Sequence, residues 1–325
     1  MKIKSQPIEF EPFLKTVIWG GEKIKNYKGV SSDLENIGES WEISGVPGHV
    51  SVVKNGPYKG KTLNELIDEF GAQLLGEHVL SKYGKVFPLL IKFIDAADNL
   101  SVQVHPDDAL ARIRHNSLGK TEMWYIIHTD KGAKIYAGLK EQLNPVEYKK
   151  RVDDGTFASA LAVYESKPGD VFFLPAGRVH AIGAGNLLAE IQETSDVTYR
   201  IYDYDRRDAD GKPRELHTNL AQDAIDYEVK DTYRSEPPAD DEKVAKLAEC
   251  EHFSTKRILV DGELELPLSS KTFHIIIGID GNVMVEYPEG TKPLKPGMSL
   301  LLPTTMSSLK LKGSGKLLIT SCLPD

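Results

Sequence analysis

Three separated segments carry side chains that could bind a metal ion. Ser101, Gln103 and His105 alternate along a short apolar run, so a strand there places all three on one face. Glu122 opens a second strand-like run, and His180 follows a tight turn. Each segment alone also fits a solvent-facing strand or a hydrogen-bonded core histidine. Together the segments offer one amide oxygen, two imidazoles and one carboxylate, which suits a divalent metal: zinc first, with manganese, iron, cobalt or nickel as alternatives.

Further polar residues share a strand face with this group or with one another. Lys120 lies two residues before Glu122, although such a pair on a solvated strand is worth well under about 1 kcal/mol. Residues 186–203 form a longer run in which Glu190, Asp196 and Arg200 have the same parity. If that run is extended without a bulge, these side chains line one polar face. The alternative is a charged outer face of a barrel.

Composition limits the partners and the compartment. The 325 residues carry a formal charge of −8, which argues against a general nucleic-acid binder. No run approaches the ~20 apolar residues needed to span a bilayer, and the first residues do not resemble a secretory signal. Two cysteines, Cys250 and Cys322, are too few for a disulfide framework. We therefore expect a cytoplasmic protein without a nucleic-acid or membrane partner.

The elements that must position these residues are mostly strands. Short β-branched or aromatic runs, separated by Gly, Pro, Asn and Asp, predict a mainly β sandwich or barrel. Helical spacing is confined to Thr62–Leu75, Asn144–Val152 and Leu220–Ile225. The stretch Asp231–Cys250 contains two consecutive prolines and many acids, which predicts a linker.

An internal repeat divides the chain into two related halves. The segment Lys167–Pro175 (KPGDVFFLP) recurs as Lys295–Pro303 (KPGMSLLLP). Upstream, Lys120–Ile126 (KTEMWYI) has a fainter echo in Lys271–Ile277 (KTFHIII). A Pro-Gly turn before an apolar strand is common, but two blocks in the same order favour duplication.

The two copies differ at the proposed metal ligands. In the second copy Phe273 stands at the position of Glu122, and Ser308 at that of His180. We therefore expect one active domain and one domain without the means to bind the metal.

Three blocks in fixed order carry a specific resemblance. QVHP from Gln103, KTEMW from Lys120 and PAGRVHAIG from Pro175 resemble the type I phosphomannose isomerases, which are zinc enzymes of the cupin superfamily. The run ETSDVTYRIYDYDR from Glu193 is similar to the short form of that family. The resemblance implies a mainly β chain with two cupin-like barrels (double-stranded β-helices), a few short helices and a degenerate second barrel. Residues 1–235 are then the catalytic metal-binding domain with helical insertions, and residues 236–325 the C-terminal domain without metal ligands.

The resemblance also implies the site residues and a cofactor of one Zn²⁺ per chain. It assigns Gln103, His105, Glu122 and His180 as metal ligands, Lys120, Glu190, Asp196 and Arg200 as catalytic residues, and Arg200, Ser101 and Lys120 as substrate contacts. Some family members place a histidine directly before the active-site lysine, where this chain has Gly119. Opening of the sugar ring then needs another group or a water, or the reaction starts from open-chain sugar.

The activity implied is the interconversion of mannose 6-phosphate and fructose 6-phosphate by a monomer. The base that moves the proton between C1 and C2 is Lys120 first and Glu190 second. Arg200 could bind the phosphate with two hydrogen bonds or act at C1–C2. One alternative is a sugar-phosphate-binding cupin without catalysis. A metal-dependent cupin oxygenase ranks last, because such enzymes present His-x-His where this chain has Gln103-Val104-His105.

Overall fold

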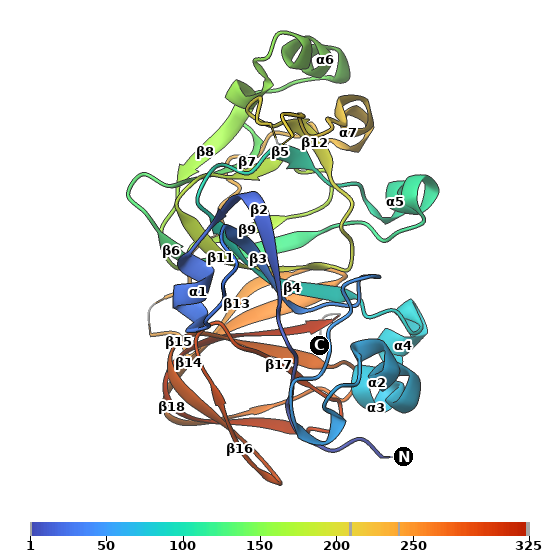
Figure 1. Ribbon diagram of the computed structural model, residues 1–325, viewed down its shortest axis with the longest axis vertical. Coiled ribbons are helices and arrows are strands. Elements are labelled where there is room, and N and C mark those ends of the chain that lie inside the picture. The colour runs from blue at the N-terminus through green and yellow to red at the C-terminus, as the bar shows by residue number, and fades with distance from the viewer. Residues whose placement is uncertain (1, 208–209, 240, 323–325) are drawn as a thin grey trace.

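The computed structural model describes residues 2–207, 210–239 and 241–322 and is mainly β (Figure 1). Residue 1 and residues 323–325, at the outer ends of the two predicted domains, lie outside this range. The described strands form three antiparallel sheets. Within the described ranges no helix combines the length and the apolar character needed to cross a bilayer.

The first sheet forms one wall of the N-terminal barrel. In spatial order its strands are β2 (Phe13–Gly21), β3 (Ile37–Ile43), β4 (Leu89–Ala96), β11 (Asn186–Glu193), β6 (Glu122–Thr129) and β9 (Val171–Leu174). Both central strands are buried along their whole length, β4 between β3 and β11, and β11 between β4 and β6.

The second sheet forms the opposite wall. In spatial order its strands are β12 (Tyr199–Tyr202), β5 (Val102–Val104), β10 (His180–Ile182), β7 (Lys134–Leu139) and β8 (Leu161–Glu165). Side chains of both sheets, among them Trp124, Leu188 and Ile182, pack into one apolar core. The polar site lies next to this core, within the same barrel.

The third sheet builds the C-terminal barrel, shown in orange and red in Figure 1. In spatial order its strands are β1 (Ile8–Glu9), β17 (Ser299–Leu302), β15 (His274–Tyr287), β18 (Ser308–Cys322), β14 (Phe253–Pro267) and β13 (Val244–Glu249), with β16 (Gly290–Leu294) paired to β15. The N-terminal strand β1 is thus part of the C-terminal sheet. One apolar core joins the two barrels. It contains Phe93 from the first sheet, Leu318 from the third sheet, and Phe273, which directly precedes β15 of the third sheet.

Seven short α-helices lie in the described part of the chain. They are α1 (Lys23–Lys28), α2 (Leu63–Phe70), α3 (Ala72–Leu75), α4 (Glu77–Tyr83), α5 (Asp108–His115), α6 (Pro145–Asp153) and α7 (Thr218–Ala224), with 3-10 turns at Gly56–Tyr58 and Phe157–Ala160. The predicted helix from Thr62 divides into α2 and α3 at Gly71, whose φ of 48° ends the first helix. Thr62 and Asn144 cap their helices with capping boxes.

Three sequence expectations need correction. Helical spacing was expected only in residues 62–75, 144–152 and 220–225, but α1, α4 and α5 lie outside these segments. The predicted linker Asp231–Cys250 contains β13, which pairs with β14, so the connection between the barrels ends before Val244. Residues 186–203 are two strands in different sheets, β11 and β12, separated by the irregular segment 194–198. The side chain of Gln192 donates to the carbonyl of Glu193 at the end of β11 and to that of Ser195 in the connecting segment. The run is therefore not one extended strand, although Glu190, Asp196 and Arg200 still line one cavity.

The internal repeat has a structural counterpart in each barrel. The Pro-Gly turn precedes β9 in the first barrel and β17 in the second, and each strand pairs with the strand of the other repeated block, β6 or β15. Gly169 and Gly297 have φ values of 92° and 76°, a backbone conformation that favours glycine.

Candidate metal centre and active site

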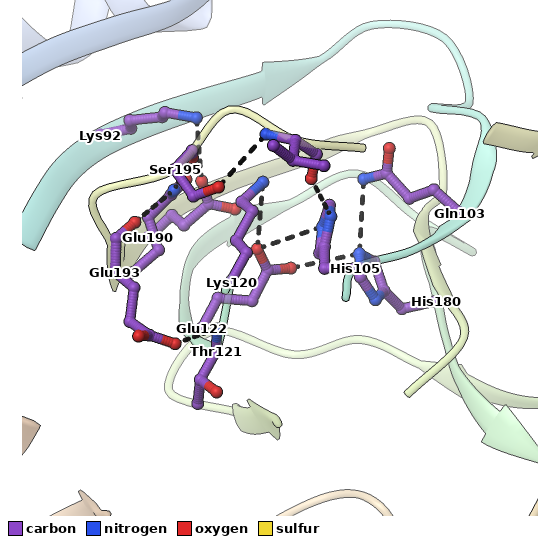
Figure 2. A network of polar contacts seen from close by, with 12 residues as sticks. Lys92, Gln103, His105, Lys120, Thr121, Glu122, His180, Glu190, Glu193 and Ser195 are labelled. Carbon is purple, nitrogen blue, oxygen red and sulfur yellow. Dashed lines mark hydrogen bonds and ion pairs between the residues drawn. The ribbon is translucent and has the colours of Figure 1, made fainter. Parts of the chain in front are cut away.

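Three strands bring the predicted metal ligands together. Gln103 on β5 and His180 on β10 are direct antiparallel partners, and His105 follows β5 immediately. Glu122 opens β6 on the facing sheet, paired with Gln192 and Leu174. Figure 2 shows these four side chains close together.

Backbone carbonyls fix the orientation of both imidazoles. Nδ1 of His105 lies 2.9 Å from the carbonyl oxygen of Val197, and Nδ1 of His180 lies 2.9 Å from that of Arg178. A proton on each Nδ1 donates to its carbonyl and leaves the lone pair of Nε2 pointing into the barrel. This second layer of contacts is typical of metal-binding histidines.

The inward atoms form a compact group around Glu122. Nε2 of His105 lies 3.6 Å from Oε2 of Glu122, and Nε2 of His180 lies 3.2 Å from Oε1. Glu122 is 0% exposed, and neither of its oxygens, nor Nε2 of His105, has a hydrogen bond of ordinary geometry to a described residue. Buried polar atoms left in this state fit a bound cation, and ligand atoms from the three residues lie within 4.8 Å of one another. His105, Glu122 and His180 are therefore a metal-binding group.

Gln103 lies beside this group, on β5. Its Nε2 lies 3.3 Å from Nε2 of His180, and rotation of the amide by half a turn presents the oxygen at the same place. Gln103 is half-buried, whereas the other three side chains are fully enclosed.

Burial sets the protonation states of these groups. It raises the pKa of Glu122 to about 7 and lowers the pKa of His180 to about 4, because each charged form loses hydration. Burial, followed by the charge of Lys120, also lowers the pKa of His105 well below its ordinary range. Both imidazoles are thus neutral near pH 7, the form that binds metals, and a divalent cation beside Glu122 would favour its ionised form.

A cavity of about 390 Å³ lies next to the metal-binding group and is lined by Gln103 and Lys120, which contact that group. Gln103, Lys120, Glu190, Asp196 and Arg200 line it together with Ser101, Lys92, Arg214, Glu39 and Trp41. All sequence-predicted substrate and catalytic residues therefore face one space, whereas His105, Glu122 and His180 are not among the residues that line it. The volume suits a small molecule rather than a polymer.

Two buried lysines lie at the floor of the cavity. Nζ of Lys120 lies 3.3 Å from Oε2 of Glu122, and Nζ of Lys92 lies 3.3 Å from Oε1 of Glu190. Nε1 of Trp124 donates to the other oxygen of Glu190 at 2.8 Å. Burial alone would raise the pKa of Glu190. The positive charges of Lys92 and Lys120 have the larger combined effect, so the pKa of this carboxyl is lowered. Figure 2 shows both lysines beside their acids.

Arg200 and Arg214 form a cationic wall of the same cavity. Arg200 donates from one terminal nitrogen to the carbonyl of Glu215 at 2.8 Å, while its Nε, buried, has no hydrogen bond to a described residue. Arg214 donates to Asp203 at 2.7 Å. Burial, then the neighbouring charge of Arg214, lowers the pKa of Arg200. Ser101 is buried on this wall, and Asp196 is exposed at the rim.

Sequence reasoning missed several cavity residues. Lys92 gave a signal, because it is a lone charge within the apolar run of β4, where every residue is buried. Glu39 and Trp41 share the β3 face toward the cavity, and Nε1 of Trp41 donates to Glu39 at 2.6 Å. Arg214 gave no comparable signal, since it follows a polar loop.

Gly119 cannot be replaced by a larger residue without movement of the backbone. A Cβ there would lie 2.6 Å from the backbone nitrogen of Asp108 and 2.7 Å from the carbonyl carbon of Asp107. The tight contact with the start of α5 explains why glycine precedes Lys120.

Comparisons with known proteins agree with this geometry. The family model for the catalytic domain of type I phosphomannose isomerase matches residues 8–125, and that for the cupin domain of mannose-6-phosphate isomerase matches residues 243–322. The mannose-6-phosphate isomerase ManA of Bacillus subtilis is 38% identical over 324 residues, covering 97% of this chain and 99% of the relative. The mannose-6-phosphate isomerase of Streptococcus mutans is 42% identical over 221 residues, 68% of either chain.

Solved structures share the whole fold. The crystal structure of the mannose 6-phosphate isomerase from Bacillus subtilis has a TM-score of 0.87 at 36% identity and covers 97% of this chain and 99% of its own. A variant of the phosphomannose isomerase from Salmonella typhimurium shares the fold, with a TM-score of 0.81 at 16% identity over 99% of this chain and 100% of its own. The chain therefore belongs to the type I phosphomannose isomerase family of enzymes.

Proposed function

We propose that this enzyme interconverts mannose 6-phosphate and fructose 6-phosphate with one Zn²⁺ per chain. The observation that carries the proposal is the buried His105, Glu122 and His180 group beside Lys120 at the floor of a small-molecule cavity. Gln103 is the fourth ligand. When bound, the metal supplies an electrophile that orients the hydroxyl and carbonyl oxygens of the sugar and stabilises negative charge on them.

Lys120 is the proposed base. From open-chain mannose 6-phosphate its amine takes the proton of C2, the electron pair of the C2–H bond forms a C1=C2 bond, and the oxygen on C1 gains a proton. Return of a proton to C1 and loss of the proton on the C2 hydroxyl give fructose 6-phosphate. Glu190 is the second candidate and the weaker base, because its pKa is lowered by the charges of Lys92 and Lys120.

The phosphate is proposed to bind at the cationic wall. Arg200 has one terminal nitrogen on a carbonyl and a buried Nε without a hydrogen bond to a described residue, so donors remain for phosphate oxygens. Ser101 is proposed to bind the substrate from the same wall, and Lys120 from the floor. A direct role of Arg200 at C1–C2 is the alternative, since it also lines the cavity.

Asp196 is the proposed catalytic group at the rim. Its exposed carboxylate can exchange protons with sugar hydroxyls and water. With Gly119 in place of a histidine, ring opening is proposed to use Asp196 or a water, or to precede binding.

The remaining assignments follow from this site. Residues 1–235 are proposed as the catalytic domain and residues 236–325 as a C-terminal domain without metal ligands, with Phe273 and Ser308 at the corresponding positions. We also propose a monomeric cytoplasmic enzyme, in keeping with two free cysteines. Light scattering of the purified protein tests the monomer.

One assay tests the activity against a binding role without catalysis. The purified protein is incubated with zinc and mannose 6-phosphate, and fructose 6-phosphate is measured. Formation of fructose 6-phosphate supports the isomerase. Binding of mannose 6-phosphate without its conversion would identify a sugar-phosphate-binding protein instead.

A further inference from the structure

The loop that carries Lys120 is held by three consecutive backbone amides. The amide of residue 119 donates to Oδ1 of Asp108 at 2.7 Å, and the next to the carbonyl of Pro106 at 3.2 Å. The third, of Thr121, donates to Oε2 of Glu193 at 2.8 Å. Pro106 and Asp108 lie in one segment at the start of α5, and Glu193 ends β11, so the backbone around Lys120 is held from two places in the fold.

Glu193 is the buried centre of this arrangement. It ends β11, is 2% exposed, and its own amide donates to the carbonyl of Thr121 at 3.1 Å. Glu193 therefore holds Thr121 from both its side chain and its backbone. Figure 2 shows its carboxylate beside Thr121, on the side of the loop away from the metal ligands.

The second oxygen of Glu193 contacts the C-terminal barrel. Oε1 lies 3.0 Å from Nδ1 of His252, which is 9% exposed and lies in the loop between β13 and β14. Burial alone would lower the pKa of His252. The negative charges of Glu193, and then of Asp108 and Glu251, have the larger combined effect, so the pKa of His252 is raised. A charged imidazole here makes a buried ion pair, and truncating one partner of such a pair leaves the other unpaired.

We infer that His252 of the C-terminal barrel is a positioning residue for Lys120, acting through Glu193 and the amide of Thr121. The inference rests on the proposed role of Lys120 as the base. A base must lie within hydrogen-bond reach of the proton it removes, and small displacements of a reacting group are costly. A barrel without metal ligands thereby contributes to the active site.

His252→Ala tests the inference, with His252→Gln as the conservative variant and the exposed His78→Ala on α4 as the matched control. We expect His252→Ala to lower kcat by about tenfold or more, with KM for mannose 6-phosphate and metal content unchanged. His252→Gln, whose amide can donate to Glu193, should recover most of kcat, and His78→Ala should match the wild type. Equal kcat in His252→Ala and wild type would overturn the inference.

A double-mutant cycle tests the route through Glu193. In a Glu193→Gln background the carboxylate that pairs with His252 is already lost, so His252→Ala should change kcat by less than about twofold. Fully additive losses would show that His252 does not act through Glu193.

Hydrogen–deuterium exchange separates this inference from the proposed function. Amides of residues 119–121 should exchange faster in His252→Ala than in wild type, whether or not Lys120 is the base. Unchanged exchange overturns the positioning role, whereas an active Lys120→Ala variant overturns the proposed base alone.

Ligand atoms of Asp108, Glu193 and His252 also lie within 4.8 Å of one another. A second metal ion per chain that His252→Ala loses would therefore replace the ion pair and overturn the inference.

Discussion

Gln103 and His180 are direct cross-strand partners on β5 and β10, and their Nε2 atoms lie 3.3 Å apart. A slip of one residue in this pairing would turn the amide to the other face of the sheet. The spacing of the metal-binding group is thus set by hydrogen-bonded strands, which hold ligands more firmly than loops do.

Replacement of Lys120 by alanine tests the proposed base. Loss of a general base costs typically about 10²–10⁴-fold in rate, so kcat of Lys120→Ala should fall by that order. Metal content should stay that of the wild type, because the ligand atoms of His105, Glu122 and His180 do not include Lys120. Lys131→Ala, at an exposed position, is the control. Full turnover in Lys120→Ala removes Lys120 from the mechanism.

The buried Lys92–Glu190 pair predicts an effect on stability. Lys92→Met leaves the carboxylate of Glu190 unpaired and buried, so the free energy of unfolding should fall by about 3–5 kcal/mol. Lys92→Met combined with Glu190→Gln removes both charges and should recover part of this loss. Urea denaturation of the wild type, of both single variants and of the double variant measures the difference. A double variant as unstable as the sum of both single variants would contradict the pairing.

Arg200→Lys tests phosphate recognition. Lysine keeps the charge but loses the planar pair of donors, so KM for mannose 6-phosphate should rise by about tenfold with a smaller change in kcat. Steady-state kinetics measure both constants, and the exposed Arg112→Lys on α5 is the matched control. A loss confined to kcat would instead place Arg200 at C1–C2.

The sequence predicts those elements that depend on contacts between residues close together in the chain. The helix starts at Thr62 and Asn144 were predicted correctly, because the capping bonds that set a helix start reach only three residues ahead. The strand β13 was missed, because its Val244–Glu249 alternation follows two prolines and a run of acids. The break between β11 and β12 was also missed; there the buried side chain of Gln192 donates to the carbonyls of Glu193 and Ser195.

The site shows the same division. The parity of short strands and the family resemblance named part of the cavity lining, including Lys120, Glu190 and Arg200, but not Lys92, Glu39, Trp41 or Arg214. The 3.3 Å approach of Lys92 to Glu190 depends on the pairing of β4 with β11, two strands almost a hundred residues apart in the chain, and local patterns do not encode such pairings. The same holds for the contact between Glu193 and His252.

Glu9 predicts a pH dependence of stability. It joins β1 to the C-terminal barrel through Lys292 at 2.8 Å, and it also contacts Lys54 and Asn55. Burial opposes its charge, but Lys292, Asn55 and Lys54 outweigh it and lower its pKa from 4.5 to about 2. The folded state thus favours the ionised form of Glu9 more than the unfolded chain does. The resulting contribution to the free energy of unfolding is fully present above pH 4.5 and is lost as the pH falls toward 2.

Glu9→Gln measures this contribution. The variant should be less stable than the wild type at neutral pH, and the two should converge as the pH approaches 2. Chemical denaturation at a series of pH values gives the gap between them. A gap that stays constant from neutral to acid pH would show that the charge of Glu9 does not stabilise the fold.

The central claim is that one divalent cation, held by Gln103, His105, Glu122 and His180, is needed for sugar-phosphate isomerisation. Metal analysis and the isomerase assay on the same purified preparation test it most directly. We predict about one divalent ion per chain, loss of fructose 6-phosphate formation on chelation, recovery with zinc, and loss of both ion and activity in Glu122→Ala. Full conversion of mannose 6-phosphate by protein shown to contain no divalent ion would contradict the account.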